Sequence, residues 1–268
     1  MHGIAPTGDP MLHFGAGGRL MRIAYPLWAA AIGLLAIAQP AHAQGYQIQP
    51  MLATIRPTGP DSRLTLSIKN TGEVPIMLEM IPFRASVNET GTPTRVPEDK
   101  DLLVYPAQTA IPPGREQTVQ IRYIGDAALA EARMYGVRVA QLPIDFRTGA
   151  AKGGANAQAD VKVSFNFLSH IIVSPESARS DIVVEVVEHK ADGGLTLRLR
   201  NPGTGIAVLN SARWTFTDAS GKSVELDTDH VQLGDFSALL PHQDRLASVA
   251  AKDVPGLTGT ITSKLEIP

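Results

Sequence analysis

An alternation of apolar and polar residues runs through the middle of the chain. Residues 161–173 read VKVSFNFLSHIIV, and the odd positions at its start form an apolar row: Val161, Val163, Phe165 and Phe167. Polar residues fill the positions between them. This period of two predicts a half-buried β-strand. Taken alone, the run fits either an ordinary core strand or a strand that can be lent to a partner.

Short runs of the same kind recur along the chain. Runs rich in β-branched residues fall at 46–55, 63–69, 76–83, 117–124, 135–142, 182–186, 195–199, 214–217 and 261–267. Pro and Gly punctuate these runs, as in PTGP at 57–60 and PPG at 112–114. Only 126–133 is compatible with a helical turn. The pattern predicts an all-β chain of antiparallel β-sandwiches, two of them joined near Ser174 and Pro175.

The N-terminal residues have the order of a secretory signal peptide. Arg19 and Arg22 precede an apolar stretch at 23–38, and Ala41-His42-Ala43 then offers a small-x-small cleavage site. The apolar stretch is shorter than the roughly 20 residues of a spanning helix. We therefore expect residues 1–43 to be a signal peptide, with Met11 or Met21 as alternative starts, and no membrane insertion of the mature chain.

Charge and cysteine content narrow the class of protein. Without Asp9, Arg19 and Arg22, the mature chain has 22 basic and 25 acidic residues, a formal net charge of −3. No basic stripe is present, which argues against nucleic acid as a partner. The chain has no cysteine, so thiol catalysis and thiolate metal sites are excluded. Export without disulfides favours the periplasm.

Motifs of enzymes are missing from the sequence. It contains no GxSxG, no phosphate-cradling loop and no HExxH. Asp227, Asp229 and His230 lie close together, but a solvated loop explains them better than a metal site does. We expect no enzymatic activity, no cofactor and no metal.

Six motifs occur in the order found in one family. They are LTLSIKNTGEVP at 64–75, VYP at 104–106, IPPG at 111–114, YGVRVAQLP at 135–143, the alternating run at 161–173 and LRNPG at 199–203. In these motifs the chain resembles the periplasmic chaperones of the chaperone–usher pathway, which assemble pili and fimbriae. Its segment from Tyr135 and its asparagine-glycine turns resemble the divergent, archaic-like branch.

The resemblance implies a fold and a function. It implies two immunoglobulin-like domains in a boomerang arrangement, an N-terminal one at 44–173 and a C-terminal one at 174–268. Members of the family bind, fold and cap pilus subunits by donating a β-strand, and they deliver the subunits to an outer-membrane usher without a cofactor. The strand-donating side chains would be those of the apolar row: Val161, Val163, Phe165 and Phe167.

The chain departs from the family at the basic pair that holds the subunit's C-terminal carboxylate. The lysine position falls on His170, and the arginine position on Thr54, or on Leu52 in a shifted register. Arg56 lies two residues beyond Thr54 and is the candidate replacement. The alternative for His170 is a partly buried strand histidine with no ligand role.

The family's usher-contacting residues are also only partly present. The proline is Pro75, while Tyr105 and Gln120 occupy the other two positions, and Arg122 is placed to restore the lost charge.

An alternative function shares the same fold. A two-domain periplasmic binding or adhesion module would never donate a strand, and fold alone does not separate the two.

Overall fold

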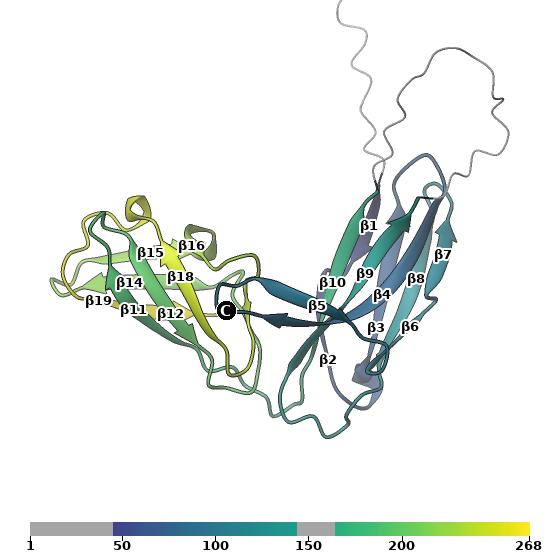
Figure 1. Ribbon diagram of the computed structural model, residues 1–268, viewed down its shortest axis with the longest axis horizontal. Helices are drawn as coiled ribbons and strands as arrows, with labels where there is room; N and C mark the ends of the chain where they lie inside the picture. Colours follow the sequence, from purple (N-terminus) through teal and green to yellow (C-terminus); the bar gives the residue numbers. More distant parts are fainter. Residues whose placement is uncertain (1–44, 144–163) are drawn as a thin grey trace, which may run out of the picture. The chain divides into compact units, whose positions relative to one another are not determined.

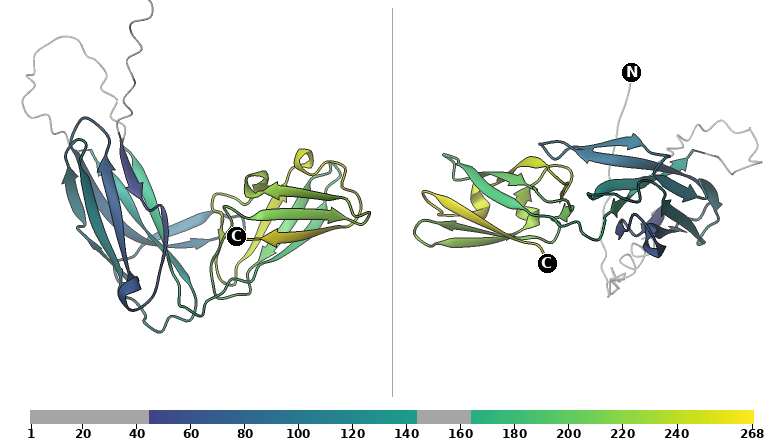
Figure 2. Two further views of the ribbon diagram at one scale, coloured as in Figure 1. Left: turned by 180° about the vertical axis from the view of Figure 1, so that it is seen from behind. Right: turned by 90° about the horizontal axis from the view of Figure 1, so that it is seen from below.

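The computed structural model describes residues 45–143 and 164–268 (Figures 1 and 2). All of the described residues belong to one unit. The first set of strands is β1 (Tyr46–Gln49), β2 (Leu52–Ile55), β3 (Arg63–Asn70), β4 (Ile76–Val87), β5 (Pro93–Pro97), β6 (Leu102–Tyr105), β7 (Gln108–Ile111), β8 (Glu116–Tyr123), β9 (Arg133–Leu142) and β10 (Asn166–Val173). A 3₁₀ turn, η1 (Pro60–Ser62), precedes β3.

This first set folds into a sandwich of two sheets. One sheet has the order β1-β3-β8-β6, and the other has the order β2-β10-β9-β4-β5 with β7 paired to β4. Neighbouring strands are antiparallel except β2 and β10, which are parallel. The alternate residues of β3 and β8 turn inward, so Leu66, Ile68, Val119 and Ile121 are fully buried in one core. Period-two alternation thus builds this sandwich.

The second set of strands forms another antiparallel sandwich. It contains β11 (Val183–His189), β12 (Leu195–Arg200), β13 (Ala207–Val208), β14 (Arg213–Asp218), β15 (Ser223–Asp227), β16 (Val231–Gln232), β17 (Ala238–Leu239), β18 (Asp244–Val249) and β19 (Ile261–Glu266), with the 3₁₀ turns η2 (Thr228–His230) and η3 (Ala251–Asp253). The sheets have the orders β11-β12-β18-β16 and β15-β14-β19, and β13 pairs with β17. Trp214 is fully buried in this core, and its Nε1 donates to Thr228 Oγ1 at 3.0 Å.

The all-β prediction is confirmed, with two local corrections. The run predicted at 46–55 is two strands in different sheets, β1 and β2. Residues 126–132 hold no helix, and β9 begins at Arg133. The domain boundaries and the boomerang arrangement stay predictions.

Gly136 leaves room for the Phe83 ring in the middle of the sheet that contains β4, β9 and β10. His170 of β10 lies opposite Gly136 of β9, which lies opposite Phe83 of β4. A Cβ on Gly136 would lie 2.4 Å from Phe83 Cζ and 2.5 Å from the carbonyl oxygen of Ser169. The Phe83 ring fills the space that the missing side chain leaves, so only glycine fits here.

Candidate functional site

The described part of the apolar row lies at the start of β10. The Phe165 side chain is 37% exposed, and Phe167 is half-buried against the first core. The Phe167 ring meets the Tyr46 ring edge-on at 4.8 Å and stacks with the Phe165 ring at 6.5 Å. Val161 and Val163 lie outside the described residues. The row therefore leads from the buried core to an exposed aromatic ring.

The side chains of odd and even residues of β10 lie on opposite faces of the sheet. Ile171 and Val173 continue the row of Phe167 into the first core. Leu168 and Ile172 face the other way and pack in a separate apolar cluster around Phe83. The described strand begins at Asn166, one residue after Phe165, and positions 161–163 of the predicted run lie outside the described residues.

One edge of β10 is only half covered. β9 pairs with β10 along its whole length, whereas β2 pairs with it only from His170 onward. The His170 N–H donates to Met51 O at 2.8 Å, on the β2 side, while Phe165 O accepts from Gln141 N on the β9 side at 3.1 Å. Backbone groups alternate along a strand, so the N–H and C=O of Asn166 and Leu168 also point to the β2 side. No described strand pairs with them there.

The chain crosses between the sheets at the point where this open edge ends. β1 belongs to the sheet of β3, and β2 belongs to the sheet of β10. Ser169 Oγ donates to Pro50 O at 2.8 Å and fixes the crossing. Tyr46 Oη donates to Val139 O at 2.6 Å, and burial raises the pKa of this phenol to about 12, which keeps it a donor. No role was predicted for Tyr46, although its place in an alternating run marks it as buried.

The predicted carboxylate-binding pair does not come together. Leu52, not Thr54, lies opposite His170. Arg56 follows Ile55, which pairs with Val173, and its Nη1 donates to Ser174 O at 3.3 Å. Four residue positions along a strand separate Ser174 from His170, about 13 Å. Arg56 therefore lies too far along the chain, past the end of β2, to share a binding site with His170.

His170 is a partly buried ring between two aromatic side chains. The Phe83 and Phe236 ring centroids lie 5.7 and 5.1 Å from its own. Its Nε2 is buried and has no hydrogen-bond partner among the described residues. Burial, and to a lesser extent the charge of Arg95, lowers the pKa of His170 from 6.5 to about 4. The imidazole is therefore neutral near pH 7, which favours the alternative reading of this residue.

We expect His170 to make stability fall in acid. Its pKa is lower in the folded than in the unfolded chain, so the unfolded state binds more protons between about pH 6.5 and 4. This contribution is complete above pH 6.5 and is lost as the pH falls through 4, at a cost of about 1–2 kcal/mol. Urea unfolding at pH 7 and pH 4.5 measures it. His170→Leu should lose less stability between these pH values than the wild type, and exposed His189→Leu should lose as much. Equal losses in all three proteins would contradict the assignment.

Three of the four predicted usher-contacting residues share one sheet face. Tyr105 of β6 lies opposite Gln120 of β8, and Arg122 lies opposite Leu103, two residues away. Tyr105 is 73% exposed and Leu103 54%, so the face is open. Pro75 is exposed and immediately precedes β4, a strand of the other sheet.

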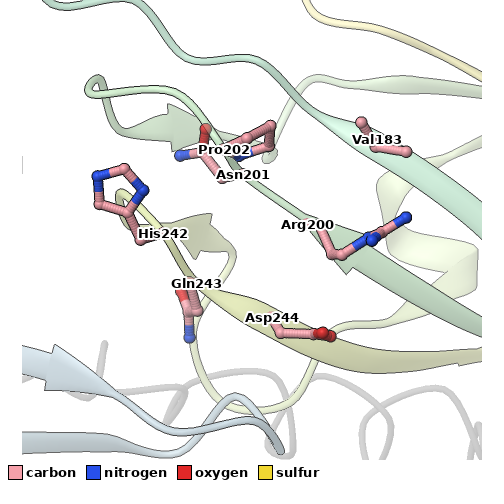
Figure 3. A pocket seen from close by; sticks show the side chains of 7 residues that line it. All are labelled: Val183, Arg200, Asn201, Pro202, His242, Gln243 and Asp244. Atoms are coloured by element: carbon pink, nitrogen blue, oxygen red, sulfur yellow. The ribbon is translucent and has the colours of Figure 1, made fainter.

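A shallow pocket in the second sandwich was not predicted from the sequence. It has a volume of about 430 Å³ and is lined by Val183, Arg200, Asn201, Pro202, His242, Gln243 and Asp244 (Figure 3). Arg200 pairs with Glu185, and Asp244 lies 3.6 Å from Arg198 Nε. These charges have partners already, so the pocket offers little for catalysis.

Within residues 45–143 and 164–268, no group of three His, Cys, Asp or Glu side chains is placed to hold a metal ion. His230 pairs instead with Asp253, with Nδ1 and Oδ1 2.9 Å apart. The described residues also contain no helix long and apolar enough to span a membrane.

Comparison with known proteins finds similarity in structure alone. No family model matches the sequence, and no curated protein does. The class 5 fimbriae chaperone CfaA is 11% identical with a TM-score of 0.51, over 84% of this chain and 100% of that one. The E. coli chaperone DraB is 14% identical with a TM-score of 0.50, over 78% of this chain and 86% of that one.

A chain from the Salmonella enterica complex of the SafA pilin with the SafB chaperone is also similar. It is 16% identical with a TM-score of 0.50, over 81% of this chain and 88% of that one. Identities this low establish the fold and leave function open. The predicted pair of immunoglobulin-like sandwiches is thereby confirmed: the chain has the two-domain fold of fimbrial chaperones.

Proposed function

We propose that this chain is a non-enzymatic periplasmic chaperone of the chaperone–usher pathway. It captures pilus or fimbrial subunits, folds and caps them by donating a strand, and delivers them to an outer-membrane usher. The observation that carries the proposal is the open edge at Asn166 and Leu168 beside the exposed ring of Phe165. The shared fold and the six motifs in family order support it.

The chemistry of the edge suits strand donation. A subunit that lacks its last strand exposes an apolar groove and an unpaired edge, both of which invite aggregation. The backbone groups of Asn166 and Leu168 offer ladder hydrogen bonds to such a subunit, and Phe165 and Phe167 offer side chains for its groove. Val161 and Val163 would extend the same row. Folding of the subunit drives the exchange, so no nucleotide is required.

Contact with the usher is assigned to the exposed face of β6 and β8. Tyr105, Gln120 and Arg122 present an aromatic ring, an amide and a cation side by side on that face. Aromatic and arginine side chains are enriched in protein interfaces. Pro75 contributes to a separate part of the surface.

Hydrogen exchange of the mature chain tests strand donation directly. In a complex with a subunit co-expressed in the periplasm, the amides of Asn166 and Leu168 should exchange at least about ten times more slowly than in the free chain, because they gain hydrogen-bond partners. The amides of Phe167 and Ser169 already point to β9 and serve as internal controls. Unchanged exchange at Asn166 and Leu168 in a stable complex would favour the binding or adhesion module.

A further inference from the structure

The open edge of β10 ends at a defined residue. Met51 O accepts the His170 N–H at 2.8 Å, and from there on β2 occupies the edge. A partner strand that pairs with Asn166 and Leu168 therefore cannot continue its ladder past Met51. Its last paired residue must lie next to the crossing between β1 and β2.

The side chains at that end are apolar. Met51 is 51% exposed and Leu52, the first residue of β2, is 40% exposed, so the two adjacent apolar side chains reach the surface. Leu52 pairs in register with His170, so the two side chains lie on the same face. Leu168, two residues before His170, shares this face and is half-buried.

His170 and Arg56, the two residues predicted to bind the subunit's carboxylate, place no positive charge at the end of the open edge. Burial lowers the pKa of His170 to about 4, so its ring is neutral near pH 7. Arg56 lies beside Ser174, beyond the end of the open edge, and donates to its carbonyl oxygen.

We propose that Met51 and Leu52 form an apolar patch that receives the last paired side chain of the captured strand. The chain would then select subunits whose strand ends in an apolar residue, and would hold that end by burial instead of by an ion pair. The inference rests on the proposed function, because it requires a strand on the open edge. It follows that capture should depend on the partner's terminal side chain and depend little on salt.

A pair of matched substitutions on β2 tests the patch. Leu52→Asp places a carboxylate in the patch, and the amount of subunit co-purified from periplasm should fall about tenfold or more. Thr54→Asp is the control, since Thr54 is also exposed and on the same face but lies opposite Ile172, past the end of the edge. It should capture subunit like the wild type. Leu52→Ser repeats the test without a new charge, and thermal melting shows whether each variant is folded.

A salt wash and the Phe165→Glu variant distinguish a failure of the apolar patch from a failure of the proposed function. The wild-type complex should lose less than about half of its subunit when washed with 0.5 M instead of 0.05 M NaCl, whereas a loss of about tenfold would indicate an ionic anchor and overturn the patch. If the folded Leu52 variants capture subunit normally while Phe165→Glu does not, the patch is wrong and strand donation stands. If Phe165→Glu also captures normally, the proposed function itself fails.

Discussion

Phe165→Glu is expected to abolish subunit capture while the chain itself stays folded. The Phe165 side chain is already 37% exposed, so a glutamate there remains in water in the free protein. In a filled groove the same carboxylate would be buried without a partner, at a cost of several kcal/mol. We expect at least about a hundredfold less subunit bound, since every 1.4 kcal/mol changes affinity tenfold.

Co-expression with a subunit and purification from the periplasm measures the effect. Asn166→Ala is the matched control, because the Asn166 side chain is exposed on the opposite face and its backbone N–H and C=O remain. The control should capture subunit normally. A Phe165→Glu protein that still binds subunit but has lost its own stability would show that the row is ordinary core, and the binding or adhesion module would then be preferred.

The strands were predictable because their signal is local. Alternate burial in β3 and β8 follows directly from the period of two in the sequence. The division of 46–55 into β1 and β2 was not predictable from the run itself. β1 pairs with β3 nearby in sequence, whereas β2 pairs with β10, more than a hundred residues further on. Only the tertiary fold determines that Pro50 stands between two sheets.

The predicted site residues differ in the same way: some are brought together by adjacent strands, and others depend on the tertiary fold. Tyr105, Gln120 and Arg122 come together because β6 and β8 are adjacent antiparallel strands. The pairing of His170 with Arg56 rested on counted positions, and counting does not determine the register between β2 and β10. Nor does the sequence show that Phe236 and Phe83 enclose the His170 ring and keep it neutral. The open edge depends on where β2 starts to pair, which no local pattern encodes.

Gly136→Ala is expected to destabilise the first sandwich strongly. The new Cβ would lie 2.4 Å from Phe83 Cζ and 2.5 Å from the Ser169 carbonyl oxygen, and a distance below 3.0 Å forces one of them to move. The carbonyl belongs to the backbone of β10 and cannot rotate away. We expect a loss of about 3 kcal/mol, a large part of the ~5–15 kcal/mol that stabilises a typical domain.

Urea unfolding of the mature chain measures this loss. Gly45→Ala is the control, because no atom lies within 4 Å of its Cβ, and its effect should stay within about 0.5 kcal/mol. Adding Phe83→Ala to Gly136→Ala removes the ring but not the Ser169 carbonyl, so stability should not return to that of the wild type. A wild-type unfolding midpoint for Gly136→Ala would mean that β10 can move away from β9. The open edge at Asn166 and Leu168 would then lack the fixed backbone position that strand donation requires.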